Sequence, residues 1–79
     1  MVVLKAQYSM KGDGIMAISI KAARVNAGFT QREVGKRVGK SKNTIASYEA
    51  YTTVPDIQTA QAMAALFKMS VDDIAWAQE

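Results

Sequence analysis

The sequence predicts an all-α fold, a compact five-helix domain at residues 19–79 that follows an N-terminal extension at residues 1–18. From Ser19 onward, apolar residues recur at helical spacing and are separated by helix-capping signals. The length of 79 residues allows one domain with a small core. The second and third predicted helices are joined by only three or four residues, which fixes them at a steep angle.

The composition argues against several kinds of functional site. The chain has no cysteine and no histidine, so we expect no disulfide, no zinc site, no histidine-based catalysis and no cofactor. No convergent carboxylate pair remains once Asp72 and Asp73 are assigned to helix capping, and we therefore do not expect an enzyme. No apolar run approaches the roughly 20 residues that span a bilayer, so we expect a cytoplasmic protein without membrane contact.

The first two helices are expected at residues 20–27 and 31–38. Ser19 is the predicted N-cap of the first helix, and Gly28 ends it. Gly35 lies in the middle of the second helix, where glycine costs about 1 kcal/mol relative to alanine. A close neighbour is the expected reason for this glycine, and we predict that the second and third helices touch there.

The remaining helices also carry clear start signals. The third helix is expected at residues 42–50 and the fourth at residues 57–67, with Asp56 as the N-cap of the fourth. A further capping box at residues 70–73 predicts a short fifth helix that runs through Trp76 and closes the domain.

The N-terminal extension has a different pattern. Apolar and polar side chains alternate over residues 2–8, turn-forming residues follow at 11–14, and a second apolar run occupies 15–18. This pattern is typical of a short β-hairpin, which would have to pack on the helices or pair across a dimer, because an isolated hairpin is marginal in water. A disordered extension is the equally open alternative.

Basic side chains are concentrated in one part of the chain. Seven of the ten Lys and Arg residues lie within 21–42, where Glu33 is the one acidic residue, whereas five of the seven acidic residues lie within 43–79. Charged runs often do no more than solvate a helix surface. Here the basic segment coincides with the two closely joined helices, and this coincidence favours nucleic-acid binding.

Residues 28–49 contain two helix starts separated by a tight turn. Thr30 and Glu33 form a capping box for the second helix, Gly39 follows its end, and Ser41 is the predicted N-cap of the third helix. Two helices joined in this way form a helix-turn-helix arrangement, in which the second helix of the pair is presented to a major groove.

The same motifs carry a family resemblance, which rests on residues 23–24, 28–34, 39–41, 43–45, 47–49, 54–55 and 70–74. With these motifs in this order, residues 20–76 resemble the lambda-repressor-like helix-turn-helix family, also called Xre-like, which includes phage repressors and Cro proteins. The segment 20–28 looks especially like small regulators of phages and prophages of low-GC Gram-positive bacteria. The resemblance implies five helices, a bacterial or phage-infected cell, and sequence-specific binding of double-stranded operator DNA, usually as a homodimer.

The resemblance also implies roles for individual residues. Lys42, Asn43 and Ser47 match positions that contact base edges, and their chemistry agrees, because lysine can donate to guanine, asparagine pairs with adenine and serine is permissive. Arg24 and Glu49 match a pair that the family joins as an internal salt bridge. The side chains expected at phosphates are Thr30, Gln31, Lys40, Ser41, Thr44, Tyr51 and Thr52, with Thr53 in the same loop.

Simpler interpretations remain open for some of these residues. Asn43 could be an exposed polar residue that contacts nothing, and Thr30 and Ser41 could act mainly as helix caps, worth about 1 kcal/mol each.

Two positions depart from the family pattern. After Glu49 the family usually has Asn-Gly, whereas this chain has Ala50 and Tyr51. A left-handed tyrosine would cost roughly 1 to 2 kcal/mol, so we expect the third helix to end differently or to continue for about a turn. The Tyr51 hydroxyl could then replace the lost phosphate contact. Lys40 stands where an apolar residue is usual, and it adds a charge near DNA.

The function expected from this pattern is that of a sequence-specific, DNA-binding transcriptional regulator of the Cro or repressor type, with the third helix in the major groove. The alternative is a protein-interaction module, such as an antitoxin subunit or a regulator controlled by a partner such as an antirepressor or a toxin. Its surfaces would be the acidic C-terminal third, the apolar N-terminal strand and Trp76, unless Trp76 instead covers the core.

Overall fold

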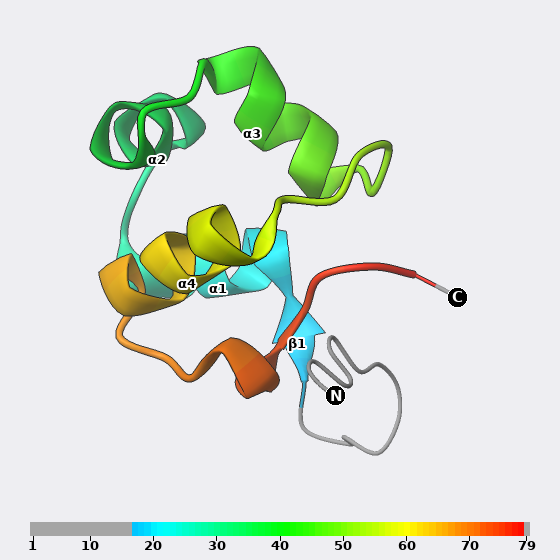
Figure 1. Ribbon diagram of the computed structural model, residues 1–79. Coiled ribbons are helices and arrows are strands. Elements are labelled where there is room, and N and C mark those ends of the chain that lie inside the picture. Colours follow the sequence, from blue (N-terminus) through cyan, green and yellow to red (C-terminus); the bar gives the residue numbers. More distant parts are fainter. Residues whose placement is uncertain (1–16, 79) are drawn as a thin grey trace.

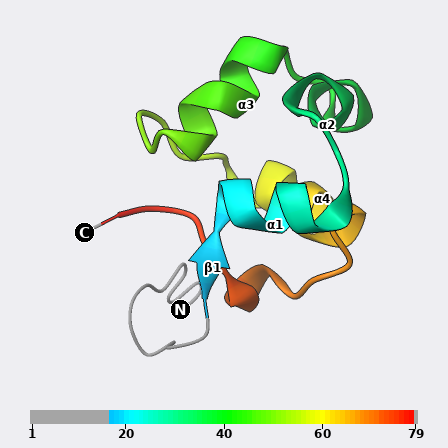
Figure 2. The ribbon, with the colours of Figure 1, turned by 180° about the vertical axis from the view of Figure 1, so that it is seen from behind.

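The computed structural model describes residues 17–78, which form a mostly helical unit with one short pair of strands. In Figure 1, α2 and α3 lie at one end, α1 and α4 cross the middle, and β1 lies at the other end; the reverse view in Figure 2 shows the same order. The elements are β1 (Ile18–Ser19), α1 (Ile20–Ala27), α2 (Gln31–Val38), α3 (Lys42–Glu49), α4 (Ile57–Leu66), the 3-10 turn η2 (Val71–Asp73) and β2 (Ile74–Ala75).

The core is built from side chains of every helix. The largest fully buried side chains are Ile20 of α1, Val34 of α2, Ile45 of α3, Met63 of α4, and Trp76 after β2. Burying an aliphatic side chain of this size contributes about 1.5 to 3 kcal/mol, so these contacts hold the four helices together. Trp76 therefore covers the core and does not offer an exposed surface to a partner.

Local capping residues fix the start of each helix as the sequence predicts. Ser19, Thr30, Ser41 and Asp56 each accept a hydrogen bond from the backbone N–H three residues further on. The predicted starts of all four helices are confirmed, together with the ends of α1 and α2. The third and fourth helices end one residue earlier than predicted, at Glu49 and Leu66.

The prediction of a fifth helix is wrong. Only one 3-10 turn, Val71–Asp73, follows the cap at Ser70, and the chain then becomes extended at Ile74. Ile74 and Ala75 pair in parallel with Ile18 and Ser19. A helix over these residues could not form this pairing, because its backbone hydrogen bonds would be internal. The indole N–H of Trp76 donates to the Val71 carbonyl at 2.9 Å, which leaves the ring in the core. The described residues therefore form a mostly helical fold with one short pair of strands, and they contain four α-helices instead of the five predicted.

The predicted N-terminal hairpin falls almost entirely outside the described residues. Of its second arm the structure describes residues 17 and 18, and Ile18 is indeed in a strand. Its partner is Ile74, far along the chain and in parallel orientation, so this strand is not the arm of a hairpin with residues described here. The expected boundary between extension and domain, after residue 18, falls inside β1.

Gly35 has the close neighbour that its position predicts, although the neighbour is a turn and not α3 itself. A Cβ atom on Gly35 would lie 2.6 Å from the carbonyl oxygen of Lys40 and 3.3 Å from the carbonyl carbon of Ser41. The chain that connects α2 to α3 therefore passes directly over Gly35, and a glycine is needed there for the turn to be this tight.

Candidate nucleic-acid interface

The connection between α2 and α3 consists of Gly39, Lys40 and Ser41. Gly39 has a left-handed backbone with φ of 75°, and the Lys40 N–H donates to the Gly35 carbonyl at 2.8 Å. The Ser41 hydroxyl then accepts from the Thr44 N–H at 3.1 Å and starts α3. Each of the three residues is thus fixed by a backbone conformation or a hydrogen bond, and the angle between the helices is fixed with them.

The α3 helix has a buried side and an outward side. Ile45 and Tyr48 are buried, whereas Lys42 and Asn43 are exposed and Ser47 is half-buried. Residues four apart share a helix face, so Asn43 and Ser47 lie together opposite the buried side, and Lys42 flanks them. The structure therefore brings the three predicted base-contacting residues to the outward part of α3.

Two small apolar residues, Ala46 and Ala50, share this outward side, and neither was among the residues expected to contact DNA. Ala46 is half-buried and Ala50 is exposed, and helical spacing places both next to Asn43 and Ser47. Alanine methyl groups can contact the methyl group of thymine in the major groove. Helical spacing alone predicts this placement, although alanine forms no side-chain hydrogen bond.

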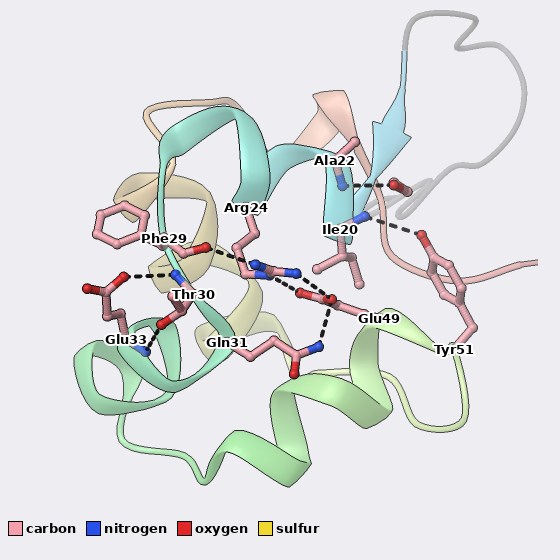
Figure 3. Close-up of polar contacts among 10 residues, drawn as sticks. Ile20, Ala22, Arg24, Phe29, Thr30, Gln31, Glu33, Glu49 and Tyr51 are labelled. Atoms are coloured by element: carbon pink, nitrogen blue, oxygen red, sulfur yellow. Dashed lines mark hydrogen bonds and ion pairs between the residues drawn. The ribbon is translucent and has the colours of Figure 1, made fainter.

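A buried ion pair fixes the far end of α3 (Figure 3). The Arg24 guanidinium donates to both carboxylate oxygens of Glu49, at 2.5 Å from Nε and 3.2 Å from Nη2. Only 12% of the Arg24 side chain and 5% of the Glu49 side chain are exposed. Arg24 Nη1 also donates to the Phe29 carbonyl at 2.8 Å. The structure thus contains the ion pair that the family resemblance implies, between α1 and the last residue of α3.

Gln31 extends this network to α2. Its Nε2 donates to Glu49 at 3.0 Å, so the first residue of α2 is tied to the last residue of α3. Gln31 was expected only at a phosphate, and the Glu49 contact adds an internal role. An open hollow lies beside it, at the N-terminus of α2, where free backbone N–H groups favour an anion. Its lining residues are Arg24, Thr30, Gln31, Arg32, Glu33 and Lys42.

The other expected phosphate-contacting residues divide into caps and exposed side chains. Thr30 and Ser41 do act as caps, since their hydroxyl groups accept from the N–H groups of Glu33 and Thr44. The Ser41 hydroxyl also lies 3.0 Å from that of Thr44. Lys40 and Thr52 are exposed, on the turn before α3 and the loop after it.

The exit from α3 contradicts the expectation for Tyr51. Tyr51 keeps the left-handed conformation, with φ of 60°, and α3 ends at Glu49 without an extra turn. The N–H groups of Tyr51 and Thr52 donate to the carbonyls of Tyr48 and Ser47, the pattern of a Schellman motif. The Tyr51 hydroxyl donates to the Ala75 carbonyl at 2.8 Å, so an internal contact takes the place of the expected phosphate contact.

Charge is distributed unevenly over the described residues. Lys36, Lys40 and Lys42 are exposed on α2, the turn and the start of α3. The Arg37 guanidinium lies 5.6 Å from the centre of the Phe29 ring. Asp72 and Asp73 are exposed on η2, which lies at the opposite end of the molecule from α2 and α3 (Figure 1). Exposed lysines thus lie on α2, on the turn and at the start of α3, and exposed carboxylates lie on η2.

Two other kinds of site are not found in residues 17–78. No helix in this part of the chain is both long and apolar enough to cross a membrane. Within the same residues, no three side chains of metal-binding type lie close enough together to hold an ion.

The short turn, the exposed side of α3 and the buried Arg24–Glu49 pair together define a helix-turn-helix domain. Residues 20–74 match the family model described as helix-turn-helix. The chain is also similar to the uncharacterized HTH-type transcriptional regulator YgzD of Bacillus subtilis (strain 168), with 30% identity over 64 residues that cover 81% of this chain and 97% of that protein. No solved structure matches the chain. The chain thus belongs to the lambda-repressor-like, or Xre-type, helix-turn-helix family.

Proposed function

We propose that the protein is a sequence-specific, DNA-binding transcriptional regulator that inserts α3 into the major groove of an operator. The observation that carries this proposal is the outward side of α3, where Asn43 and Ser47 share a face, Lys42 is exposed at the start, and the helix is fixed at both ends. The name of the similar Bacillus subtilis protein, an HTH-type transcriptional regulator, supports the same function.

Each contact in the proposed complex follows from side-chain chemistry. Asn43 pairs with an adenine through its amide, Lys42 donates to guanine O6 or N7, and Ser47 bonds to a neighbouring base. The phosphates on either side are bound by the N-terminus of α2, by the turn before α3 and by the loop after it. The side chains assigned to these phosphates are Thr30, Gln31, Lys40, Ser41, Thr44 and Thr52.

A dimer fits the size of the domain. The longest dimension of the described part is 30 Å, close to the roughly 34 Å of one turn of DNA. One copy therefore covers one half-site, and two copies are needed for a two-fold operator. Such a dimer would act as Cro proteins and phage repressors act, by occupying the operator and so controlling access of the polymerase.

Selection of binding sites from random duplexes, followed by titration at several salt concentrations, tests this function. We expect a two-fold symmetric motif and an affinity that falls steeply with salt, with a log–log slope of about −0.9 for each phosphate that a lysine or arginine neutralises. The slope is expected because bound lysine and arginine displace counterions from DNA. A flat salt dependence between about 50 and 200 mM, or the absence of any enriched motif, would contradict the proposal.

Replacing Asn43 with alanine tests the assignment of base contacts. Asn43→Ala should lower affinity for the selected operator by about 1 to 3 kcal/mol and relax the preference at one base pair of each half-site. Gln61→Ala is the matched control, because it removes an exposed amide from α4, away from the proposed interface. Unchanged specificity in Asn43→Ala would remove this residue from the base-contacting set.

The alternative, a protein-interaction module such as an antitoxin subunit, has less support from the described residues. Trp76, one of its expected surfaces, is fully buried. Its remaining described surface is the exposed acidic pair Asp72 and Asp73. A stoichiometric partner, such as a toxin or an antirepressor, that stays bound after nuclease treatment would favour this alternative.

A further inference from the structure

The loop between α3 and α4 has two inward-pointing side chains, Tyr51 near its start and the buried Pro55 near its end. From residue 50 to residue 54, Tyr51 is the one side chain that is not exposed, and it packs against the core. The backbone at Tyr51 is left-handed, a conformation that costs about 1 to 2 kcal/mol for a residue other than glycine. Strained conformations of this kind persist where surrounding contacts fix them. The contacts of Tyr51 should therefore be strong enough to offset this cost.

The hydroxyl group of Tyr51 continues the strand pair. Strands β1 and β2 pair through Ile18 with Ile74 and through Ser19 with Ala75, and the chain then leaves β1 to begin α1. At that point the Tyr51 hydroxyl accepts from the Ile20 N–H at 3.4 Å and donates to the Ala75 carbonyl at 2.8 Å. The contact with Ile20 is drawn in Figure 3. The hydroxyl thus links the backbone acceptor of Ala75, in the last residue pair, to the backbone donor of Ile20, just beyond it.

Between Tyr51 and the buried Pro55, the loop has few contacts of its own. Its backbone hydrogen bonds return to α3 itself, from the N–H groups of Thr52 and Thr53 to the Ser47 carbonyl at 3.0 and 3.5 Å. The side chains of Thr52 and Thr53 are exposed. The Tyr51 ring and hydroxyl are therefore what connects this loop to the strand pair.

We propose that Tyr51 is a positioning residue for DNA binding: it ties the loop after α3 to the β1–β2 pair, and so sets where Thr52 and Thr53 meet the phosphate backbone. This inference rests on the proposed function, and it assigns Tyr51 no contact with DNA. Phosphate contacts fix the register of a protein on the duplex without selecting the sequence. Releasing the loop should therefore weaken binding to all sequences alike.

Tyr51→Phe tests this proposal, because it removes the hydroxyl and keeps the ring. In the full chain, at a temperature where circular dichroism shows the variant folded, affinity for the selected operator should fall about threefold to tenfold. The salt slope and the base preference should both stay unchanged, because Thr52 and Thr53 carry no charge and displace no counterions. Amide exchange at Ile20 should become faster, because its N–H loses its acceptor.

Two further variants separate positioning from stability. Ser70→Ala removes another hydroxyl group, which accepts a hydrogen bond from the Asp72 N–H on η2. This variant should lower stability without changing affinity. Tyr51→Gly relieves the left-handed strain but also removes the anchor, so it should lose affinity in the same way even where stability recovers.

The outcomes are distinct. Wild-type affinity in Tyr51→Phe would overturn the proposal, even if the melting temperature falls. A changed preference at one base pair would also overturn it, because Tyr51 would then act at a base. If the wild-type chain binds no selected duplex, the proposed function fails and this proposal fails with it, whereas loss of the Tyr51→Phe effect alone leaves the function standing.

Discussion

At the scale of single residues, the left-handed backbone conformation after each helix is unstrained for glycine and strained for any other residue. Gly28 and Gly39 follow α1 and α2 with φ of 86° and 75°, where glycine is free of strain. Tyr51 and Lys68 follow α3 and α4 with φ of 60° at the equivalent place. Tyr51 is compensated by its internal hydrogen bonds, whereas the Lys68 side chain is exposed.

Lys68→Gly should therefore stabilise the protein. The left-handed residue after α4 would no longer carry a Cβ atom, which should raise the free energy of unfolding by about 1 kcal/mol. For a domain of this size, the melting temperature should rise by about 4 to 8 °C in a thermal melt. Lys68→Ala is the control, since it removes the charge and keeps the strain. Equal melting temperatures for the two variants would show that the backbone at Lys68 is not strained.

The outward side of α3 could be predicted from sequence because helical spacing is local information. Ile45 and Tyr48 mark the buried side, and Lys42, Asn43 and Ser47 fall outside it. The hydrogen bonds of Gln31 to Glu49 and of Tyr51 to Ala75 could not be found in this way. Their partners lie 18 and 24 positions away in the chain, and only the packing of the helices brings them together.

At the scale of elements, capping explains why the helix starts were predicted and the C-terminal helix was not. A cap needs only the few residues that follow it, so Ser19, Thr30, Ser41 and Asp56 determine their helices locally. Ser70 also caps a turn, but Ile74 then finds a strand partner in Ile18. Pairing between the two ends of the domain has no local signature in the sequence.

The start of α4 should make stability depend on pH. Hydrogen bonds from the Thr59 side chain and from its backbone N–H hold the pKa of Asp56 below its usual value of 3.8. A carboxylate with a lowered pKa stabilises the folded state above the unfolded pKa, and this stabilisation is lost as the pH falls through the folded pKa. Thermal melts from neutral pH to about pH 2 should therefore show a loss of stability that begins near pH 4.

Asp56→Asn isolates this contribution, because asparagine also caps helices and does not titrate. The loss of stability below about pH 4 should be smaller in Asp56→Asn than in the wild-type chain. Asp72→Asn serves as the comparison, on an exposed acidic residue of η2. If Asp56→Asn and the wild-type chain lose stability in parallel, other carboxylates control the acid transition.

At the scale of the whole molecule, most exposed basic residues of the described part lie on the same elements as the helix-turn-helix. The exposed lysines of α2, the turn and α3 lie at one end, and the acidic residues of η2 lie at the other (Figure 1). A charge distribution of this kind orients a protein before contact, so that α2 and α3 approach a polyanion first. The buried Arg24–Glu49 pair then keeps these helices in a fixed relation to α1.

The pairing of β2 with β1 also gives the protein an intrinsic optical probe. The chain contains a single tryptophan, and Trp76 is fully buried directly after Ala75, whose carbonyl binds the Tyr51 hydroxyl. Its fluorescence therefore reports on the segment that holds the loop after α3. A change in the tryptophan emission of the unlabelled protein on addition of DNA would show that binding at one end alters the strand pair at the other.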